Sequence, residues 1–267
     1  MFSNCASGLG GRLACHALVA GVLITACLSS ACGGGTSDEA PRPAAPVTNP
    51  VDPATAGRIG GKVTLIGTPP AREKIKTIND PGCTGTITTE EVVTGADGAL
   101  QNVFVYVKDG LGNRVFPVPA TPAVLAQEQC MYRPHVLGIQ VGQTLDIVNG
   151  DDLLHNIHAV PTANGEFNKA QQFKGFRNQH VFSIKEVLVP FKCDVHRWMT
   201  AYVGVVDHPF FAVTGNGGTF SLEGLPPGTY TIEAVHEKYG RQTQTVTLEA
   251  KGSQDIAFTF KTSQGSA

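Results

Sequence analysis

The stretch Phe191-Lys192-Cys193-Asp194-Val195-His196-Arg197-Trp198-Met199 gathers three soft metal ligands in one short segment. Cys193 supplies a thiolate, His196 an imidazole and Met199 a thioether, and two residues separate each ligand from the next. Thiolate and thioether ligands combined with imidazole select copper. The stretch therefore predicts a copper-binding loop between an incoming and an outgoing strand.

A second histidine must come from elsewhere in the chain, because a blue-copper site needs two histidines, one cysteine and a weak axial methionine. His155 is the candidate, since it follows the strand-like residues 144–148. Side chains alternate faces along a strand, so His155 and His158 point to opposite faces and only one of them can reach the metal. We choose His155, and we interpret His158 as a surface histidine or a neighbour of the ligands.

Residues 129–207 resemble the cupredoxins, most closely the amicyanin type, because the ligand residues occur in the family's order and spacing. The resemblance implies a Greek-key β-sandwich that binds copper as its cofactor. The implied copper ligands are His155, Cys193, His196 and Met199. The strand periodicity also predicts that both sulfurs point into an apolar interior.

The same resemblance implies roles for the residues around the metal. Asn156 would hold the Cys193 loop by a hydrogen bond, a backbone amide would donate to the sulfur, and the ring edge of His196 would reach the surface. The chain departs from the family at Arg197-Trp198, which replaces a proline-led pair, and at Phe191, where tyrosine is common.

A second resemblance lies near the C-terminus. Residues 217–232 read GGTFSLEGLPPGTYTI and resemble the carboxypeptidase-regulatory or transthyretin-like β-sandwich family, with a Gly-x-Phe strand, a Leu-Pro-Pro-Gly turn and a Tyr-containing strand. In that family the domain begins with a strand such as 61–65, followed by one such as 102–107. We therefore expect the cupredoxin unit to be inserted into this sandwich, whose halves would be 58–118 and 209–262.

The predicted fold class is all-β, because Gly 31 and Pro 17 with only 16% charged residues indicate short strands joined by turns. The predicted segments are a signal peptide with a lipobox (1–32), a disordered tether (33–57), an N-terminal β segment (58–121), a cupredoxin-like copper domain (122–208), a carboxypeptidase-regulatory-like sandwich (209–262) and a tail (263–267).

The N-terminal residues indicate export. Arg12 precedes the apolar residues 13–26, a run of signal-peptide length. Cys27 and Cys32 each end a lipobox-like stretch, and either could be the lipid anchor. The expected location is therefore extracytoplasmic, periplasmic or at the cell surface, with the protein lipid-anchored to a bacterial membrane. Disulfides persist there, and we expect one between Cys83 and Cys130.

The favoured function is single-electron transfer by a type 1 copper protein that is not an enzyme, with a cytochrome c or a dehydrogenase as the type of redox partner. A formal net charge of -2 gives no reason to expect nucleic acid. The alternatives are copper delivery without electron transfer, a Cys-His nucleophile, an adhesive or carbohydrate-binding sandwich, and a zinc site made by four residues. That zinc set would be His155, His158, Cys193 and His196.

The other histidines give weaker signals. His135 and His180 are expected to be exposed, and the sequence suggests no chemistry for His208 or His236. The oligomeric state is not indicated by the sequence.

Overall fold

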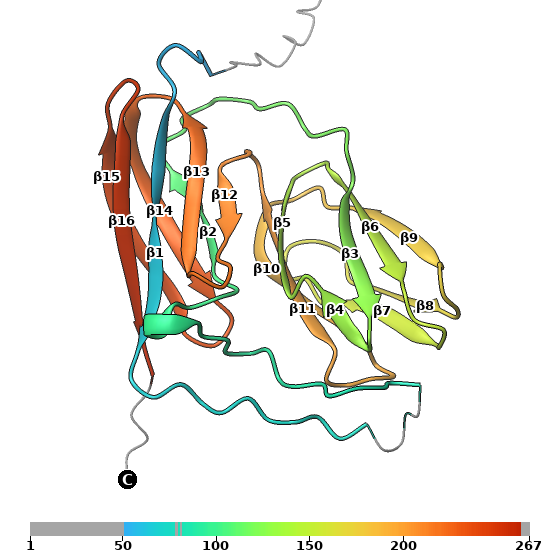
Figure 1. Cartoon of the computed structure of the whole chain (residues 1–267). Coiled ribbons are helices and arrows are strands. Elements are labelled where there is room, and N and C mark those ends of the chain that lie inside the picture. The colour runs from blue at the N-terminus through green and yellow to red at the C-terminus, as the bar shows by residue number, and fades with distance from the viewer. Residues whose placement is uncertain (1–50, 78–79, 81, 263–267) are drawn as a thin grey trace, which may run out of the picture. The chain divides into compact units, whose positions relative to one another are not determined.

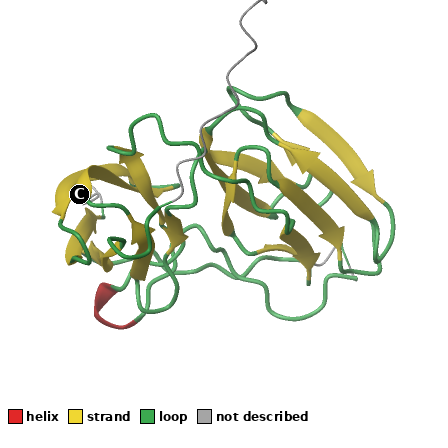
Figure 2. Cartoon of the chain, turned by 90° about the horizontal axis from the view of Figure 1, so that it is seen from above, coloured by secondary structure: helices red, strands yellow, loops and turns green. Residues whose placement is uncertain are grey.

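The computed structural model describes residues 51–77, 80 and 82–262. Within these ranges the chain forms sixteen strands and one short 3-10 helix, η1 (Ala96–Gly98), as Figures 1 and 2 show. The prediction of an all-β fold is confirmed. No helix in the described part is long and apolar enough to cross a membrane. The predicted signal peptide with Cys27 and Cys32, the first part of the tether and the tail lie outside the described residues.

One β-sandwich is built from both ends of the described chain. Its first sheet has the order β13 (Thr219–Leu225), β1 (Gly57–Ile66), β16 (Ser253–Lys261). Its second sheet has the order β12 (Phe211–Val213), β2 (Phe104–Asp109), β14 (Gly228–His236), β15 (Gly240–Leu248). Strand β1 is central and pairs in parallel with β16. Residues 209–262 therefore need β1 and β2 to complete both sheets.

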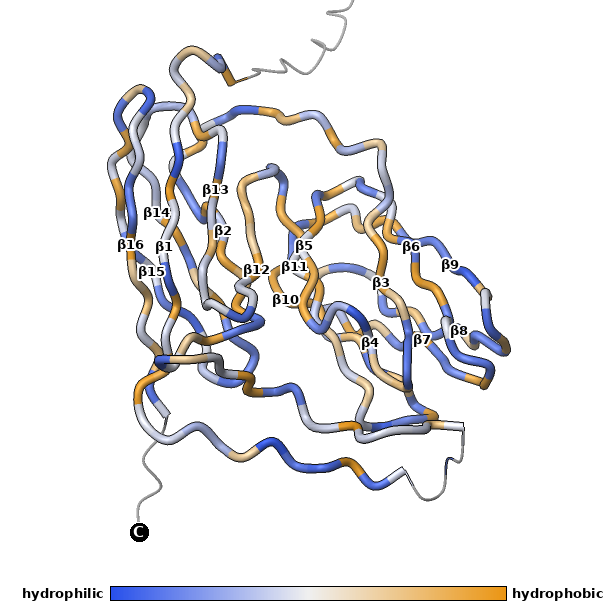
Figure 3. Tube along the Cα trace, viewed as in Figure 1, coloured by the Kyte–Doolittle hydropathy of each residue, from blue (hydrophilic) through white to orange (hydrophobic). Residues whose placement is uncertain are grey.

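The alternating pattern of the strands fills the core of this sandwich. Val103, Val105 and Val107 are buried beside Phe220 and Tyr230 in one apolar cluster. The hydropathy colouring of Figure 3 alternates along the strands in the same way, as expected when each strand has one face in a core. The Leu225-Pro226-Pro227-Gly228 turn is fixed by the Tyr230 hydroxyl, which donates to the Pro226 carbonyl.

The predicted boundary between tether and domain is wrong by several residues. The predicted tether includes residues 51–57, but Val51 packs against the sandwich core and β1 already begins at Gly57. The Lys251 amide donates to the Thr55 carbonyl at 3.0 Å, so backbone hydrogen bonding anchors this segment to the β15–β16 turn.

A second β-sandwich lies between β2 and β12 in the sequence. One sheet has the order β5 (Val136–Gln140), β11 (Thr200–Val206), β10 (Glu186–Lys192), β7 (His155–Ala159), β8 (Phe167–Gln171). The other has the order β4 (Met131–Arg133), β3 (Ala123–Glu128), β6 (Thr144–Asn149), β9 (Arg177–Val181). Its own apolar cluster includes Phe182, Phe191 and Met199. The topology thus places this second sandwich, which we call the inserted domain, as an insertion in the other sandwich.

Part of the N-terminal β segment leaves its sandwich and joins the inserted domain. In this arm, which we define as residues 72–77, 80 and 82–90, an isolated bridge pairs Lys74 with Thr88. Ile87 is buried in the core of the inserted domain and Ile75 packs against it. Placing all of residues 58–118 with the C-terminal sandwich is therefore wrong for the arm, because its apolar side chains find their partners in the inserted domain.

Two glycines let the sheets of the two sandwiches approach each other. Gly138 on β5 pairs with Gly204 on β11. A Cβ at Gly204 would lie 2.5 Å from Phe104 of β2, and a Cβ at Gly138 would lie 2.4 Å from Phe211 of β12. Atoms do not approach so closely without displacement, so only glycine allows these two rings to pack this closely against the strands.

Candidate metal centre

The predicted ligands come from two separate places in the inserted domain. His155 is the first residue of β7, and Cys193 and His196 lie in the loop that joins β10 to β11. Strand β10 pairs with β7 through Phe191 and Lys192. The two strands are antiparallel and Lys192 pairs with His158, so the loop that follows Lys192 runs back toward His155 at the start of β7.

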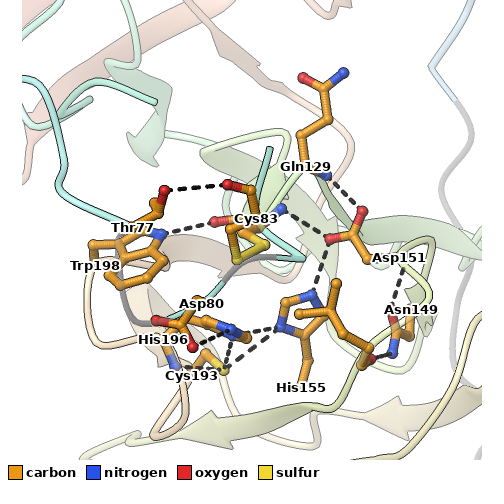
Figure 4. The surroundings of a disulfide bond; sticks show 12 residues. Thr77, Asp80, Cys83, Gln129, Asn149, Asp151, His155, Cys193, His196 and Trp198 are labelled. Atoms are coloured by element: carbon orange, nitrogen blue, oxygen red, sulfur yellow. Dashed lines mark hydrogen bonds and ion pairs between the residues drawn. A yellow bond between two sulfur atoms is a disulfide. The ribbon is translucent and has the colours of Figure 1, made fainter. Parts of the chain in front are cut away.

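Three ligand atoms converge. His155 Nδ1 lies 2.9 Å from His196 Nδ1, and Cys193 Sγ lies 3.9 Å from the first nitrogen and 3.8 Å from the second. Figure 4 shows both rings turned toward this thiol. All three side chains are buried, and Cys193 is the one free cysteine among the described residues. The structure therefore brings His155, Cys193 and His196 together as a candidate metal centre.

The spacing of these atoms fits a trigonal metal. With metal–nitrogen and metal–sulfur bonds of about 2.0 and 2.3 Å at 120°, two nitrogens are roughly 3.5 Å apart and a nitrogen and a sulfur roughly 3.7 Å apart. Both observed nitrogen–sulfur distances, 3.9 and 3.8 Å, are close to that value. The nitrogen–nitrogen distance of 2.9 Å is shorter by roughly 0.6 Å, so the two ring nitrogens would move apart on binding a metal.

Met199 closes the loop that carries the thiol. Its amide donates to the His196 carbonyl at 2.9 Å, and its carbonyl accepts from the Cys193 amide at 3.1 Å. The Met199 and Cys193 side chains are both buried in the same apolar cluster. Burial disfavours a charged sulfur, so it raises the pKa of the Cys193 thiol. A thiolate at this position needs a cation beside it.

Hydrogen bonds join Asn156 to the metal loop, as the family resemblance implies. The Asp194 amide donates to Asn156 Oδ1 at 2.6 Å, and Asn156 Nδ2 donates to the Asp194 carboxylate at 2.9 Å. The His196 amide donates to Cys193 Sγ at 3.4 Å.

His158 lies on the other side of β7, where it contacts Asp194 at 3.0 Å. The four-residue zinc set is therefore not assembled.

Asp151 is a functional residue that the sequence analysis did not identify. Its Oδ2 lies 2.9 Å from His155 Nε2 and accepts from the Cys130 amide at 2.8 Å, while its Oδ1 accepts from the Gln129 amide at 2.7 Å (Figure 4). A carboxylate on the outer nitrogen fixes the tautomer that leaves Nδ1 free for a metal. Burial lowers the pKa of His155, and Asp151 opposes that shift.

Tyr132 is a second residue that the sequence analysis missed. Its buried hydroxyl lies 3.0 Å from the carbonyls of both Asn156 and Lys192 and accepts from Gln127 Nε2 at 3.2 Å. One side chain thus bridges β7, which carries His155, and β10, which leads into the Cys193 loop.

The expectation that the edge of His196 reaches the surface is wrong. His196 is 1% exposed, because the arm covers it. Its Nε2 lies 3.5 Å from Asp80, and the sulfurs of Cys83 and Cys130 lie near the same ring (Figure 4). These two cysteines form the expected disulfide. Burial, and then the nearby His155, lower the pKa of His196, while Asp80 and Asp151 oppose the shift.

Two other histidines are not exposed as expected. His135 is 6% exposed, and its ring nitrogens contact the Thr200 carbonyl and the Glu237 carboxylate. His180 is half-buried and stacks on Phe167, with 4.1 Å between ring centroids. In both cases a residue distant in the sequence covers the ring.

The remaining two histidines have structural contacts. His208 Nε2 lies 2.7 Å from the Val107 carbonyl, which joins the junction between the sandwiches to β2. His236 is buried and Nδ1 accepts from the Lys238 amide, while no partner is found for its Nε2 within the described residues.

Comparison with known proteins gives two kinds of likeness. The model of the carboxypeptidase regulatory-like domain family matches residues 200–261, which include β11 of the inserted domain and β12–β16 of the sandwich. No curated protein matches the sequence.

Among solved structures, the chain is similar to cupredoxins. One is the novel purple cupredoxin from Nitrosopumilus maritimus, which is 26% identical with a TM-score of 0.28 over 31% of this chain and 98% of that one. Another is a point mutant of amicyanin in its reduced Cu(I) form, which is 24% identical with a TM-score of 0.29 over 33% of this chain and 85% of that one. The copper-containing nitrite reductase from Thermus scotoductus SA-01 is 19% identical with a TM-score of 0.32 over 35% of this chain, but the match spans only 24% of the reductase. The chain thus matches the carboxypeptidase regulatory-like domain model over residues 200–261, and its structural neighbours include cupredoxins.

Proposed function

We propose that this protein is an extracytoplasmic type 1 copper protein that carries single electrons between redox partners. The observation that carries the proposal is the convergence of His155 Nδ1, Cys193 Sγ and His196 Nδ1 within 4.8 Å of one another in a buried site. Two imidazoles, a thiolate and a methionine thioether form the donor set that suits copper in electron-transfer proteins. The proposed role is that of a carrier and not of an enzyme.

Copper bound there would supply a one-electron couple between Cu(I) and Cu(II). The chain's contribution is to hold the ligands in a geometry that changes little between the two states. Asp151 orients one ligand ring, Asn156 and the His196 amide fix the thiol loop, and Tyr132 joins the two strands that carry them. The apolar cluster around Cys193 excludes water from the sulfur.

The Cys83–Cys130 disulfide supports a location outside the cytoplasm, because such bonds persist in oxidising compartments. The proposal includes a lipid anchor at Cys27 or Cys32 and a cytochrome c or a dehydrogenase as the type of redox partner. Mass spectrometry of the membrane-extracted protein would identify the lipidated cysteine.

The proposal is tested by absorption and electron paramagnetic resonance spectra of the full chain loaded with copper(II), beside Cys193→Ala. Cys193 is the free thiol of the described residues, so an intense thiolate-to-copper charge-transfer band should appear in the parent protein and vanish in the variant. Absence of the band from the copper-loaded parent would refute type 1 copper.

Copper delivery is the second candidate, and it would use the same ligands. Reversible reduction and reoxidation, with copper retained over many cycles, supports electron transfer. Transfer of the copper ion itself to a partner or chelator on each cycle supports delivery.

A further inference from the structure

The route by which an electron would leave the copper rests on the proposed function and depends on how the ligands are covered. The described ligand side chains are closed off from solvent: His155 is 0% exposed, His196 1% and Cys193 2%. The outer edge of His196 faces Asp80 and the disulfide instead of a partner protein. An acceptor at the surface therefore cannot touch a ligand ring, and a different group must lie between them.

Trp198 is in the position to be that group. Its ring centroid lies 5.3 Å from that of His196, with the planes tilted by 57°. The indole is partly exposed and lines an open pocket of about 460 Å³ together with Arg197, Ile75 and Glu90. One face of the side chain is thus close to a ligand, while another part reaches the solvent.

The ring is also held in place. Trp198 Nε1 donates to the Cys130 carbonyl at 3.0 Å, and Cys130 is itself tied to the arm by the disulfide and to Asp151 by its amide. The indole body packs against the core of the inserted domain. A fixed aromatic ring between a buried ligand and an open pocket keeps the distance that an electron must cross between ligand and acceptor short and constant.

We propose that Trp198 is the exit group for electrons, in place of an exposed ligand histidine. In the step, Cu(I) loses one electron and becomes Cu(II), and a one-electron acceptor at the pocket gains that electron. Trp198 mediates the transfer and is itself neither oxidised nor deprotonated. A competing route runs from Cys193 through Asp194, whose side chain is 52% exposed, toward His158.

The first test measures the oxidation rate of the copper(I)-loaded full chain by hexacyanoferrate(III) in stopped flow. Trp198→Leu should slow the reaction about tenfold or more, Trp198→Phe should slow it less because a ring remains, and the midpoint potential should not change. Phe173→Leu, which removes an exposed aromatic side chain elsewhere, should react at the parent rate. An unchanged rate in Trp198→Leu would overturn the proposal. Slowing in His158→Gln alone would also overturn it, in favour of the Asp194 route.

The second test does not depend on the variants. Trp198 is the single tryptophan of the chain, so all indole fluorescence reports on this ring. Acrylamide should quench it in the metal-free protein, and copper(II) should quench it on binding. Emission insensitive to either quencher would overturn the proposal. If the parent shows no charge-transfer band, the proposed function fails; if the band is present but the Trp198 tests fail, only the route is wrong.

Discussion

Replacing Asp151 by asparagine tests how the outer carboxylate supports the metal centre. Asp151 accepts three hydrogen bonds, from Gln129 N, Cys130 N and His155 Nε2, at 2.7, 2.8 and 2.9 Å. An amide has one acceptor oxygen and one donor nitrogen. Whichever way it is oriented, its NH₂ group therefore faces at least one N–H donor.

The expected effect follows from these contacts. Loss of a hydrogen bond to a charged group costs about 1.5–3 kcal/mol, so the metal-free variant should be less stable by about that amount. Loss of the partner of a ligand histidine should weaken copper binding by about 10–100-fold, since similar partners contribute that much elsewhere. The affinity change corresponds to about 1.4–2.8 kcal/mol.

The assay is a competition titration of copper(I) between the protein and a chromophoric chelator, with urea unfolding of the metal-free form in parallel. Asp152→Asn is the matched control, because this neighbouring side chain is exposed and makes no hydrogen bond in the described structure. Parent-like copper affinity in Asp151→Asn, or an equal loss in Asp152→Asn, would refute the reasoning.

Three further outcomes are expected. Tyr132→Phe should lower the free energy of unfolding by about 1–2 kcal/mol, because it removes the hydroxyl between β7 and β10; an unchanged urea midpoint would contradict this. Gly204→Ala should cost about 1–3 kcal/mol through its contact with Phe104, whereas Gly165→Ala, with open space around it, should cost little. Burial, and then His135, lower the pKa of His236 from 6.5 to about 4. The unfolded chain then binds more protons, so stability should fall by up to about 3 kcal/mol as the pH drops from 6.5 to 4. His236→Phe should flatten this part of the pH profile, and a parent-like slope would refute the assignment.

Much of the centre could be predicted because it depends on local pattern. The spacing of Cys193, His196 and Met199 lies within one loop. Strand alternation allows only one of His155 and His158 to face the metal, and the family's ligand position then favours His155. The insertion could be inferred because the strand motifs at 61–65 and 102–107 belong with those after residue 209. The structure places these strands in the two sheets of one sandwich.

The errors share one physical origin, which is packing between segments distant in the sequence. The loop pattern puts His196 at the surface, but a disulfide across 47 residues holds the arm against its ring. The strand pattern leaves His135 exposed, but Glu237 of the other sandwich contacts its ring. Asp151 gives no signal in the sequence, since a carboxylate in a turn before a strand is common and only its distance to His155 reveals its role.

The most direct measurement on the central claim is copper X-ray absorption fine structure of the copper-loaded full chain. We expect a shell of one short copper–sulfur bond, from Cys193, and two imidazole nitrogens, from His155 and His196. The sulfur bond should disappear in Cys193→Ala. A copper shell of oxygen and nitrogen alone in the parent protein, or a sulfur bond that survives in the variant, would contradict this expectation.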